Sequence, residues 1–434
     1  MTRHATDAAT CRAIRDAVAE AMPAQTEFLA DLTRVPSVRG QEGPALDLVA
    51  GALGAHGMAV DDWTVPVDEL AGQPGFCRAA GEVPSVRSVV GTHRPAQARG
   101  RSLILQGHLD VVPPGPEGMW TTPPFEPVLR DGWMHGRGAG DMKAGVSANL
   151  FALAALARAG VAPAAQVHLQ AVVEEESTGL GALATLARGY RADCALIPEP
   201  TAHGLVRAQV GVLWFRLEVA GRPVHAAEAG QGANAIDAAW HVIGALREME
   251  ARWNAAAAAD PLYGGVAHPL NFNPGRISGG DWASSVPAWC HADCRMGLLP
   301  GADVDEAKAE IEATVAEAAR GHPFLSAHPP RVVWNGFEAE GYVLDHAGPA
   351  EAALAGAYRQ VFGEDGPEDR IWTALTDTRF YGLYHGIPGV CFGPRAEGIH
   401  GFDERVDLGS LQQCTETIAL FVAAWCGLEP AGDA

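Results

Sequence analysis

Apolar residues follow two alternating patterns along the N-terminal half of the chain. Longer segments repeat apolar residues at helical spacing, and the segments between them are short apolar runs of the kind found in buried strands. The expected helices are residues 8–33, 43–56, 143–159 and 179–187. The expected strands are residues 102–108, 167–173 and 194–197. This alternation predicts an α/β domain built on a mixed, mainly parallel sheet.

The pattern changes near Val210. The next elements are expected in the order strand, helix, strand, strand, helix, strand, which is typical of a ferredoxin-like α+β domain. They occupy residues 213–219, 234–253, 276–279, 288–298, 303–321 and 330–334. Further on, a helix over 348–362 and a strand over 389–392 resume the α/β pattern.

The length of the chain agrees with two domains, since 434 residues exceed what one ordinary hydrophobic core supports. We expect residues 1–210 and 335–434 to form one domain, and residues 211–334 to form a second domain inserted into the first. A hydrophobic content of 48% and a charged content of 19% are typical of a soluble globular protein.

Charge and composition exclude several kinds of partner. The net charge of −21 makes nucleic acid an unexpected partner, because binding to phosphates needs a basic surface. No stretch reaches the roughly 20 apolar residues that a membrane span needs, so no membrane partner is expected. The N-terminal segment lacks the apolar region of a signal peptide, and the eight Cys form no CxxC pair. Free thiols and the missing leader favour a cytoplasmic protein.

Candidate chemistry lies where the expected strands end, the edge at which open α/β sheets place their sites. The polar residues there are His108 with Asp110, the run Glu174-Glu175-Glu176, and Glu199. Two further candidates, Asp141 and His400, lie in glycine-rich segments. Two His and several carboxylates in this order suit two neighbouring divalent metal ions that share one carboxylate. Ligands without a thiolate favour zinc, with cobalt and manganese as alternatives.

Each candidate also has a structural explanation when it is considered alone. Asp141 could cap the helix that follows it. His108 could be a buried histidine at a strand end, with Asp110 an exposed turn residue. Three consecutive glutamates are most often a solvated acidic turn. The metal-binding explanation is favoured because the candidates occur together, and because the glutamates emerge from a buried strand.

In these residues the chain resembles the M20 metallopeptidase and deacylase family, which includes acetylornithine deacetylase and succinyl-diaminopimelate desuccinylase. The resemblance extends from about Phe28 to Asp407. It rests on five motifs in order: Gly-His-Leu-Asp, Gly-Asp-Met-Lys, Glu-Glu-Glu, Pro-Glu-Pro-Thr and Gly-Ile-His-Gly. The resemblance implies two metal ions with five ligands, of which Asp141 is shared: His108, Asp141, Glu176, Glu199 and His400.

The resemblance also implies roles for residues that do not bind metal. Asp110 would orient His108, and Glu175 would act as the general base. A cis peptide bond is implied after Asp141. The assignment within the glutamate run is open by one residue, because the family has Asp-Glu-Glu where this chain has three glutamates.

In the inserted domain the resemblance points to residues that contact substrate. His225 resembles a family histidine that stabilises the oxyanion in the other subunit's site, which implies a homodimer. Arg295 resembles an arginine that holds a substrate carboxylate. Ser284 stands where relatives often have Asn, so the product need not be an ordinary α-amino acid. Arg379, outside this domain, is another substrate-binding candidate, with a structural ion pair as the alternative.

Together these expectations describe a cytoplasmic, homodimeric di-zinc amidohydrolase of the deacetylase or deacylase kind. Its small-molecule substrate would be an N-acyl amino acid or a small N-acyl amine, from which the acyl group is removed. Two alternatives stay open. An M20-type dipeptidase or carboxypeptidase is one, and Glu199 weighs only slightly against it. A non-catalytic ligand-binding homologue is the other, but it ought to have lost Glu175 or a metal ligand.

Overall fold

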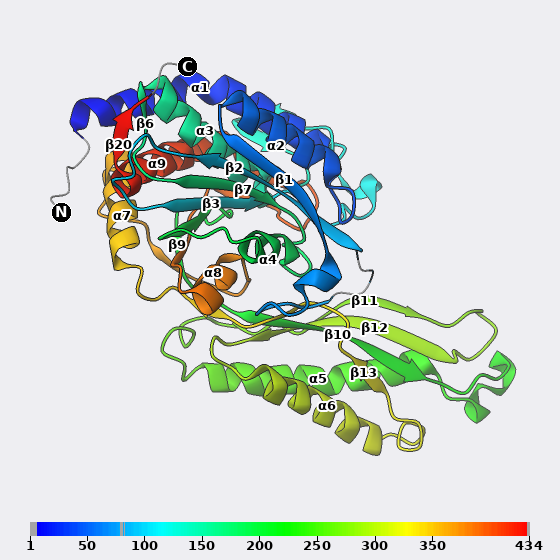
Figure 1. Cartoon of the computed structure of the whole chain (residues 1–434). Coiled ribbons are helices and arrows are strands. Elements are labelled where there is room, and N and C mark those ends of the chain that lie inside the picture. The colour runs from blue at the N-terminus through cyan, green and yellow to red at the C-terminus, as the bar shows by residue number, and fades with distance from the viewer. Residues whose placement is uncertain (1–6, 79–80, 82, 432–434) are drawn as a thin grey trace.

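The computed structural model of the chain describes residues 7–78, 81 and 83–431, so the first six residues of the N-terminal segment lie outside it. Its largest sheet has six strands in the order β1-β2-β7-β3-β8-β17 (Figure 1). They are β1 (Ala59–Pro66), β2 (Ser85–His93), β7 (Val167–Val172), β3 (Leu103–His108), β8 (Ala195–Ile197) and β17 (Gly389–Cys391). The last four are parallel to one another, whereas β2 is antiparallel to β7 and to β1. The expected mixed, mainly parallel sheet is confirmed.

Helices cover both faces of this sheet and bury its apolar side chains. They are α1 (Ala8–Arg34), α2 (Gly43–Ala55), α3 (Ala144–Arg158), α4 (Leu180–Ala187), α7 (Gly348–Phe362), α8 (Thr378–His385) and α9 (Leu408–Cys426). In Figure 1, α1, α2 and α3 lie on one side of the sheet, and α4 lies on the other. Helix α3 contacts both α1 and α9 and is buried along most of its length, which explains its nearly uniform apolar sequence.

A second, antiparallel sheet has the strand order β11-β12-β10-β13 and carries two helices on one face (Figure 1). Its elements are β10 (Gly211–Ala220), α5 (Ala235–Ala257), β11 (Asn273–Gly279), β12 (Trp289–Leu298), α6 (Val304–Arg320) and β13 (Arg331–Val333). Their order along the chain and across the sheet is ferredoxin-like, as expected. Alternate residues of β10, among them Leu213 and Phe215, pack with α5 and α6 in a core of their own. The other alternate residues, such as Trp214, lie on the face without these helices.

A four-stranded sheet brings together two segments that are distant in the chain. It consists of β18 (Ala396–Glu397), β19 (Arg405–Asp407), β5 (Trp133–His135) and β4 (Val128–Arg130), in that order. The turn with Asp141 follows β5, and the loop with His400 joins β18 to β19. Because β5 and β19 are paired, the turn and the loop lie beside each other.

The remaining short elements complete the described chain. They are the 3-10 turns η1 (Val67–Leu70), η2 (Glu117–Met119) and η4 (Ala226–Gln231), the irregular turn η3 (Ala139–Lys143), and the strands β6 (Val161–Pro163), β9 (Leu205–Gln209), β14 (Glu338–Ala339), β15 (Tyr342–Val343), β16 (Asp369–Trp372) and β20 (Leu428–Pro430). Strand β14 pairs with β10 beside the second sheet, and β9 lies between β15 and β16. None of the described helices is both long and apolar enough to cross a membrane.

Strands β1 and β2 were not among the expected strands. Strand β1 is an edge strand whose residues alternate between exposed and half-buried, and it contains the acidic pair Asp61-Asp62. Its pattern is therefore that of a strand at the surface rather than of a buried apolar run.

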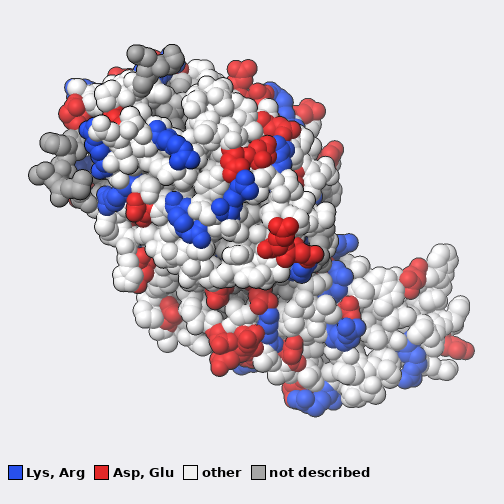
Figure 2. Space-filling view, in the orientation of Figure 1, with Lys and Arg blue, Asp and Glu red and all other residues white. Residues whose placement is uncertain are grey.

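Charged side chains are mixed on the face of the molecule that Figure 2 shows. Acidic and basic residues are interspersed there, both around the six-stranded sheet and around the second sheet.

Candidate metal centre

The turn that carries Asp141 is fixed by its neighbours before any side chain is considered. Gly138 has a φ of +77°, and a Cβ there would lie 2.4 Å from a methyl group of Val111, so glycine is required. The peptide bond between Asp141 and Met142 is cis, as the resemblance implied. Two residues on, the buried Lys143 donates hydrogen bonds of 2.9 Å to the carbonyl oxygens of Leu32 and Val35, at the end of α1.

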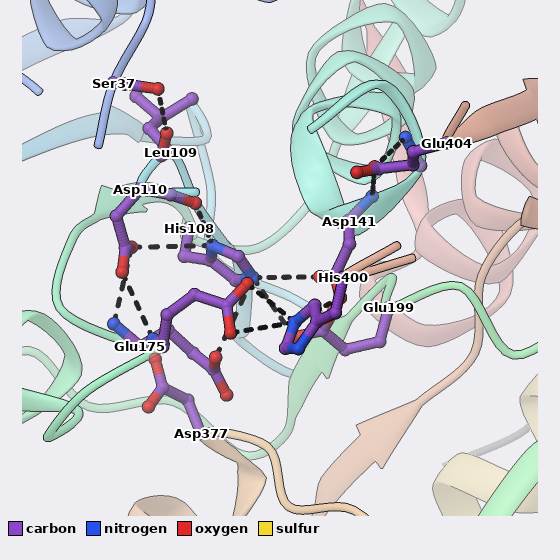
Figure 3. Close-up of polar contacts among 12 residues, drawn as sticks. Ser37, His108, Leu109, Asp110, Asp141, Glu175, Glu199, Asp377, His400 and Glu404 are labelled. Carbon is purple, nitrogen blue, oxygen red and sulfur yellow. Dashed lines mark hydrogen bonds and ion pairs between the residues drawn. The ribbon is translucent and has the colours of Figure 1, made fainter. Parts of the chain in front are cut away.

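The two carboxylate oxygens of Asp141 face two different histidines. Its Oδ1 lies 3.2 Å from Nε2 of His108, and its Oδ2 lies 3.5 Å from Nε2 of His400 (Figure 3). On the His108 side, Glu199 Oε1 approaches the same imidazole nitrogen to 3.9 Å. On the His400 side, Glu176 Oε2 approaches to 3.0 Å. The structure thus brings together the five residues expected as ligands in two groups that share Asp141.

Each group has the composition and spacing of a metal site. One ligand atom from each of His108, Asp141 and Glu199 lies within 4.8 Å of the others, and the same holds for Asp141, Glu176 and His400. Imidazole and carboxylate donors at this spacing suit zinc and similar divalent ions. A carboxylate shared between two groups is the arrangement that holds paired ions in two-metal hydrolases.

Asp110 does more than the sequence indicated. Its carbonyl oxygen lies 2.9 Å from Nδ1 of His108, and because a carbonyl only accepts, Nδ1 carries a proton and Nε2 is the ring nitrogen that faces Asp141. The Asp110 carboxylate accepts hydrogen bonds from the backbone N–H groups of Glu175, at 3.3 Å, and Glu176, at 3.1 Å (Figure 3). One residue therefore orients both an imidazole ligand and the start of the glutamate turn.

The three consecutive glutamates have three different surroundings. Glu174 is buried, has a φ of +69°, and forms an ion pair of 2.6 Å with Arg39. Glu175 Oε2 lies 3.8 Å from Nε2 of His108, at the edge of the first group. Glu176 contacts His400 in the second group. The run is thus not a solvated acidic turn.

Crowding of carboxylates changes their proton affinity. Burial raises the pKa of Glu175 and of Glu199 well above the ordinary range, and the nearby imidazole of His108 offsets only part of this effect. Burial also disfavours the charged form of Asp141, but hydrogen bonds with His108 and His400 outweigh it and lower the pKa of Asp141. Protons and divalent cations compete for such a cluster, so it is suited to holding positive charge.

The substrate-binding candidates lie in different environments. Arg295, on β12, is half-buried and donates to the carbonyl oxygens of Asn271 and Thr373 at 3.4 Å. No ion pair with Arg295 is found among the described residues, and burial lowers the pKa of its guanidinium group. Arg379 is fully buried, and its guanidinium group lies 3.8 Å from the ring centre of Phe380. It donates a hydrogen bond to the carbonyl oxygen of Thr178, which itself bonds to Glu174, so Arg379 supports the glutamate turn.

His225 and Ser284 are exposed and lie next to each other in the second sheet's portion of the chain. Nδ1 of His225 accepts a hydrogen bond of 3.1 Å from the backbone N–H of Ala227, and the Ser284 carbonyl oxygen accepts from Ala226. In the described part of the chain, no hydrogen bond or ion pair joins His225 to the Asp141 cluster. A role for His225 at the cluster would therefore require a second molecule or a movement.

Several residues that support the cluster were missed from the sequence. Arg39 holds Glu174, and Arg137 forms an ion pair of 2.6 Å with Glu404. Asp377 accepts a hydrogen bond of 2.6 Å from Gln106, and burial raises its pKa to about 6. Each of these contacts joins segments that are far apart in the chain, so the spacing of residues within a motif could not predict it.

Comparisons with known proteins show which family the chain belongs to. Residues 104–424 match the family described as Peptidase family M20/M25/M40. The chain is 30% identical over 354 residues to N-formyl-4-amino-5-aminomethyl-2-methylpyrimidine deformylase of Halalkalibacterium halodurans, which covers 76% of this chain and 81% of that protein. It is 30% identical over 403 residues to succinyl-diaminopimelate desuccinylase of Methylorubrum extorquens, which covers 88% of this chain and 94% of that one.

Solved structures share the fold at low sequence identity. The di-peptidase Dug1p of Saccharomyces cerevisiae has a TM-score of 0.78 and 16% identity, over 96% of this chain and 98% of that one. Human carnosine dipeptidase 1 has a TM-score of 0.75 and 15% identity, over 96% and 99%. The family match and the 30% identical relatives confirm the resemblance found in the sequence. The chain belongs to peptidase family M20/M25/M40 and is a hydrolase that acts on amide bonds with divalent metal ions.

Proposed function

We propose that the enzyme holds two divalent ions, with zinc favoured and cobalt or manganese as alternatives. One ion would be held by His108, Asp141 and Glu199, and the other by Asp141, Glu176 and His400. The observation that carries this proposal is that the two oxygens of Asp141 face two different imidazoles. When bound, such ions supply Lewis acidity, which acidifies a water molecule and polarises an amide carbonyl.

Glu175 is the proposed general base. It lies beside His108, and burial raises its pKa, so it accepts a proton more readily than an exposed carboxylate does. It would take a proton from the attacking water and deliver it to the leaving amine. Asp110 would hold Glu175 in place, because its carboxylate accepts a hydrogen bond from the backbone N–H group of Glu175.

The proposed substrate is a small N-acyl compound. The two relatives described above are named for removing a formyl group from an aminomethylpyrimidine and a succinyl group from diaminopimelate. Arg295 has no ion-pair partner in the described chain, and its guanidinium group could donate two parallel hydrogen bonds to a substrate carboxylate. An N-acyl amino acid is therefore favoured over an uncharged N-acyl amine. A dipeptidase remains the second candidate.

A substrate panel tests this function. Purified enzyme with zinc, cobalt or manganese would be given N-formyl, N-acetyl and N-succinyl amino acids, N-formyl aminomethylpyrimidines, and dipeptides with free amino groups. We expect turnover of N-acyl compounds, with the highest kcat/KM for one that carries a carboxylate. Turnover of dipeptides alone would replace the deacylase assignment by the dipeptidase one. No turnover of any compound by the metal-loaded protein would favour a non-catalytic homologue.

We further propose that residues 211–334 form a dimerisation domain, and that the partner's His225 completes each site by stabilising the oxyanion. His225 is exposed and, among the described residues, has no hydrogen bond or ion pair with the cluster of its own chain, which supports this arrangement. The dimer itself is tested by the molar mass in solution, for which we expect twice the 45.4 kDa of one chain.

Complementation tests the role of His225. Loss of one oxyanion donor costs about 10²–10³-fold in kcat, so His225→Ala should be nearly inactive. Mixed with inactive Glu175→Gln under subunit exchange, it should recover activity toward about a quarter of wild type. Half of the dimers would be mixed, and each mixed dimer would have one intact site. Proven exchange without recovery would place His225 in its own chain's site or outside the reaction.

A further inference from the structure

The two groups of ligands differ in how well the fold holds their histidines. The His108 side chain is 1% exposed at the end of a central strand, whereas the His400 side chain is 54% exposed on a loop. His400 also has a φ of +59°, in the left-handed region that residues other than glycine rarely adopt. The position of His400 therefore depends on contacts that hold its loop.

A buried ion pair provides such contacts. Arg137 and Glu404 lie 2.6 Å apart, and their side chains are 2% and 1% exposed. The second guanidinium nitrogen of Arg137 donates a hydrogen bond of 2.9 Å to the carbonyl oxygen of Gly401, the residue after His400. Arg137 therefore holds the loop of one metal ligand directly.

The other end of the ion pair holds the turn with the shared ligand. Oε1 of Glu404 accepts hydrogen bonds of 3.0 Å from the backbone N–H groups of both Gly140 and Asp141. Its backbone oxygen accepts from Gly136, which lies just before Arg137. Although Glu404 is a buried carboxylate near the cluster, its oxygens are directed to these partners, and Figure 3 shows it on the backbone side of Asp141.

We propose that Arg137 and Glu404 are positioning residues that couple the shared ligand to the exposed one, and thereby set the affinity of the metal group formed by Asp141, Glu176 and His400. This inference rests on the proposed two-ion centre. The group with His108 and Glu199 depends less on the pair, because these two residues lie at the ends of strands of the central sheet and Glu404 holds only the third member, Asp141. The loop has a second tether, from Asp403 to Thr121, so removing the ion pair should loosen it without releasing it.

Metal retention tests the coupling without relying on activity. Wild-type enzyme, Arg137→Met and Glu404→Gln would be equilibrated with graded chelator, and bound ions per chain would be counted by elemental analysis. Loss of residues behind metal ligands costs about 10- to 100-fold in metal affinity. In each variant we expect the ion at Asp141, Glu176 and His400 to dissociate at a free metal concentration about 10- to 100-fold higher than in wild type. The ion at His108 and Glu199 should be retained nearly as in wild type.

Glu416→Gln is the matched control. Glu416 is also a buried carboxylate, 7% exposed, and its side-chain partners, Arg15 at 2.8 Å and Gln412, belong to neither ligand group. Its loss should leave both ions bound as in wild type, and it should lower the Tm by less, because the Arg15 side chain is 39% exposed. A fall in Tm for Arg137→Met with unchanged retention of both ions would overturn the proposal, since the pair would then be only structural.

Two further variants test whether the effect of Arg137 on metal retention acts through His400 and depends on its guanidinium group. In a His400→Ala background, which already lacks the exposed ligand, Arg137→Met should have almost no further effect on retention of the remaining ion. A full additional loss there would contradict the coupling. Arg137→Lys keeps the charge but cannot hold Glu404 and Gly401 together, so it should fall between wild type and Arg137→Met even if the latter folds poorly. A wild-type enzyme that retains fewer than two ions would instead overturn the two-ion centre.

Discussion

Replacement of Glu175 by glutamine is expected to lower kcat by about 10²–10⁴-fold while both metal ions stay bound, because general acid–base catalysis contributes that much and glutamine preserves the shape of the side chain. Glu175 lies beside His108 but is outside both candidate ligand groups, so we expect metal to bind without its charge. The measurement is kcat on a substrate found with the panel, together with metal content per chain.

Glu176→Gln is the comparison that makes this result informative. Glu176 contacts His400 and belongs to the second ligand group, so its substitution should weaken one ion. Excess metal should then restore part of the activity of Glu176→Gln and none of that of Glu175→Gln. If Glu175→Gln loses metal while Glu176→Gln keeps both ions, the roles of the two residues are exchanged.

Removal of the metal ions is expected to abolish turnover. Without them the carboxylates can hold protons, but nothing acidifies the attacking water or polarises the amide carbonyl. Dialysis against a chelator should reduce kcat to background, and zinc or cobalt should restore it with a stoichiometry near two ions per chain. Full activity in protein that elemental analysis proves free of metal would refute the proposed mechanism.

Much of the fold could be predicted from the sequence, namely the elements whose apolar residues form either one continuous run or a clear helical repeat. The apolar runs of β3 and β7 are buried on both sides, and α5 and α6 repeat apolar residues at helical spacing, so each pattern has one interpretation. Strand β1 mixes acidic and apolar residues because it lies at the edge of the sheet, and its pattern resembles that of a surface loop.

The residues that the structure brings together as two candidate ligand groups could be predicted because they occupy short motifs at strand ends and glycine turns. The groups that hold the ligands could not be predicted, since they act across the chain. The backbone hydrogen bonds from Glu175 and Glu176 to Asp110 require β3 and β7 to be neighbours, which no local spacing reveals. The same applies to Arg39 with Glu174, where an N-terminal loop meets the middle of the chain.

The two hydrogen bonds from Lys143 to the end of α1 have a consequence for the limits of the catalytic unit. The family match begins only at residue 104, yet the last carbonyl groups of α1 are satisfied by an amine from the turn of the shared ligand. A fragment trimmed to the matched residues would leave this buried amine without acceptors, in a site whose burial already lowers the pKa of Lys143 to about 7. The N-terminal helix therefore supports the turn that carries Asp141, and truncations or fusions should preserve it.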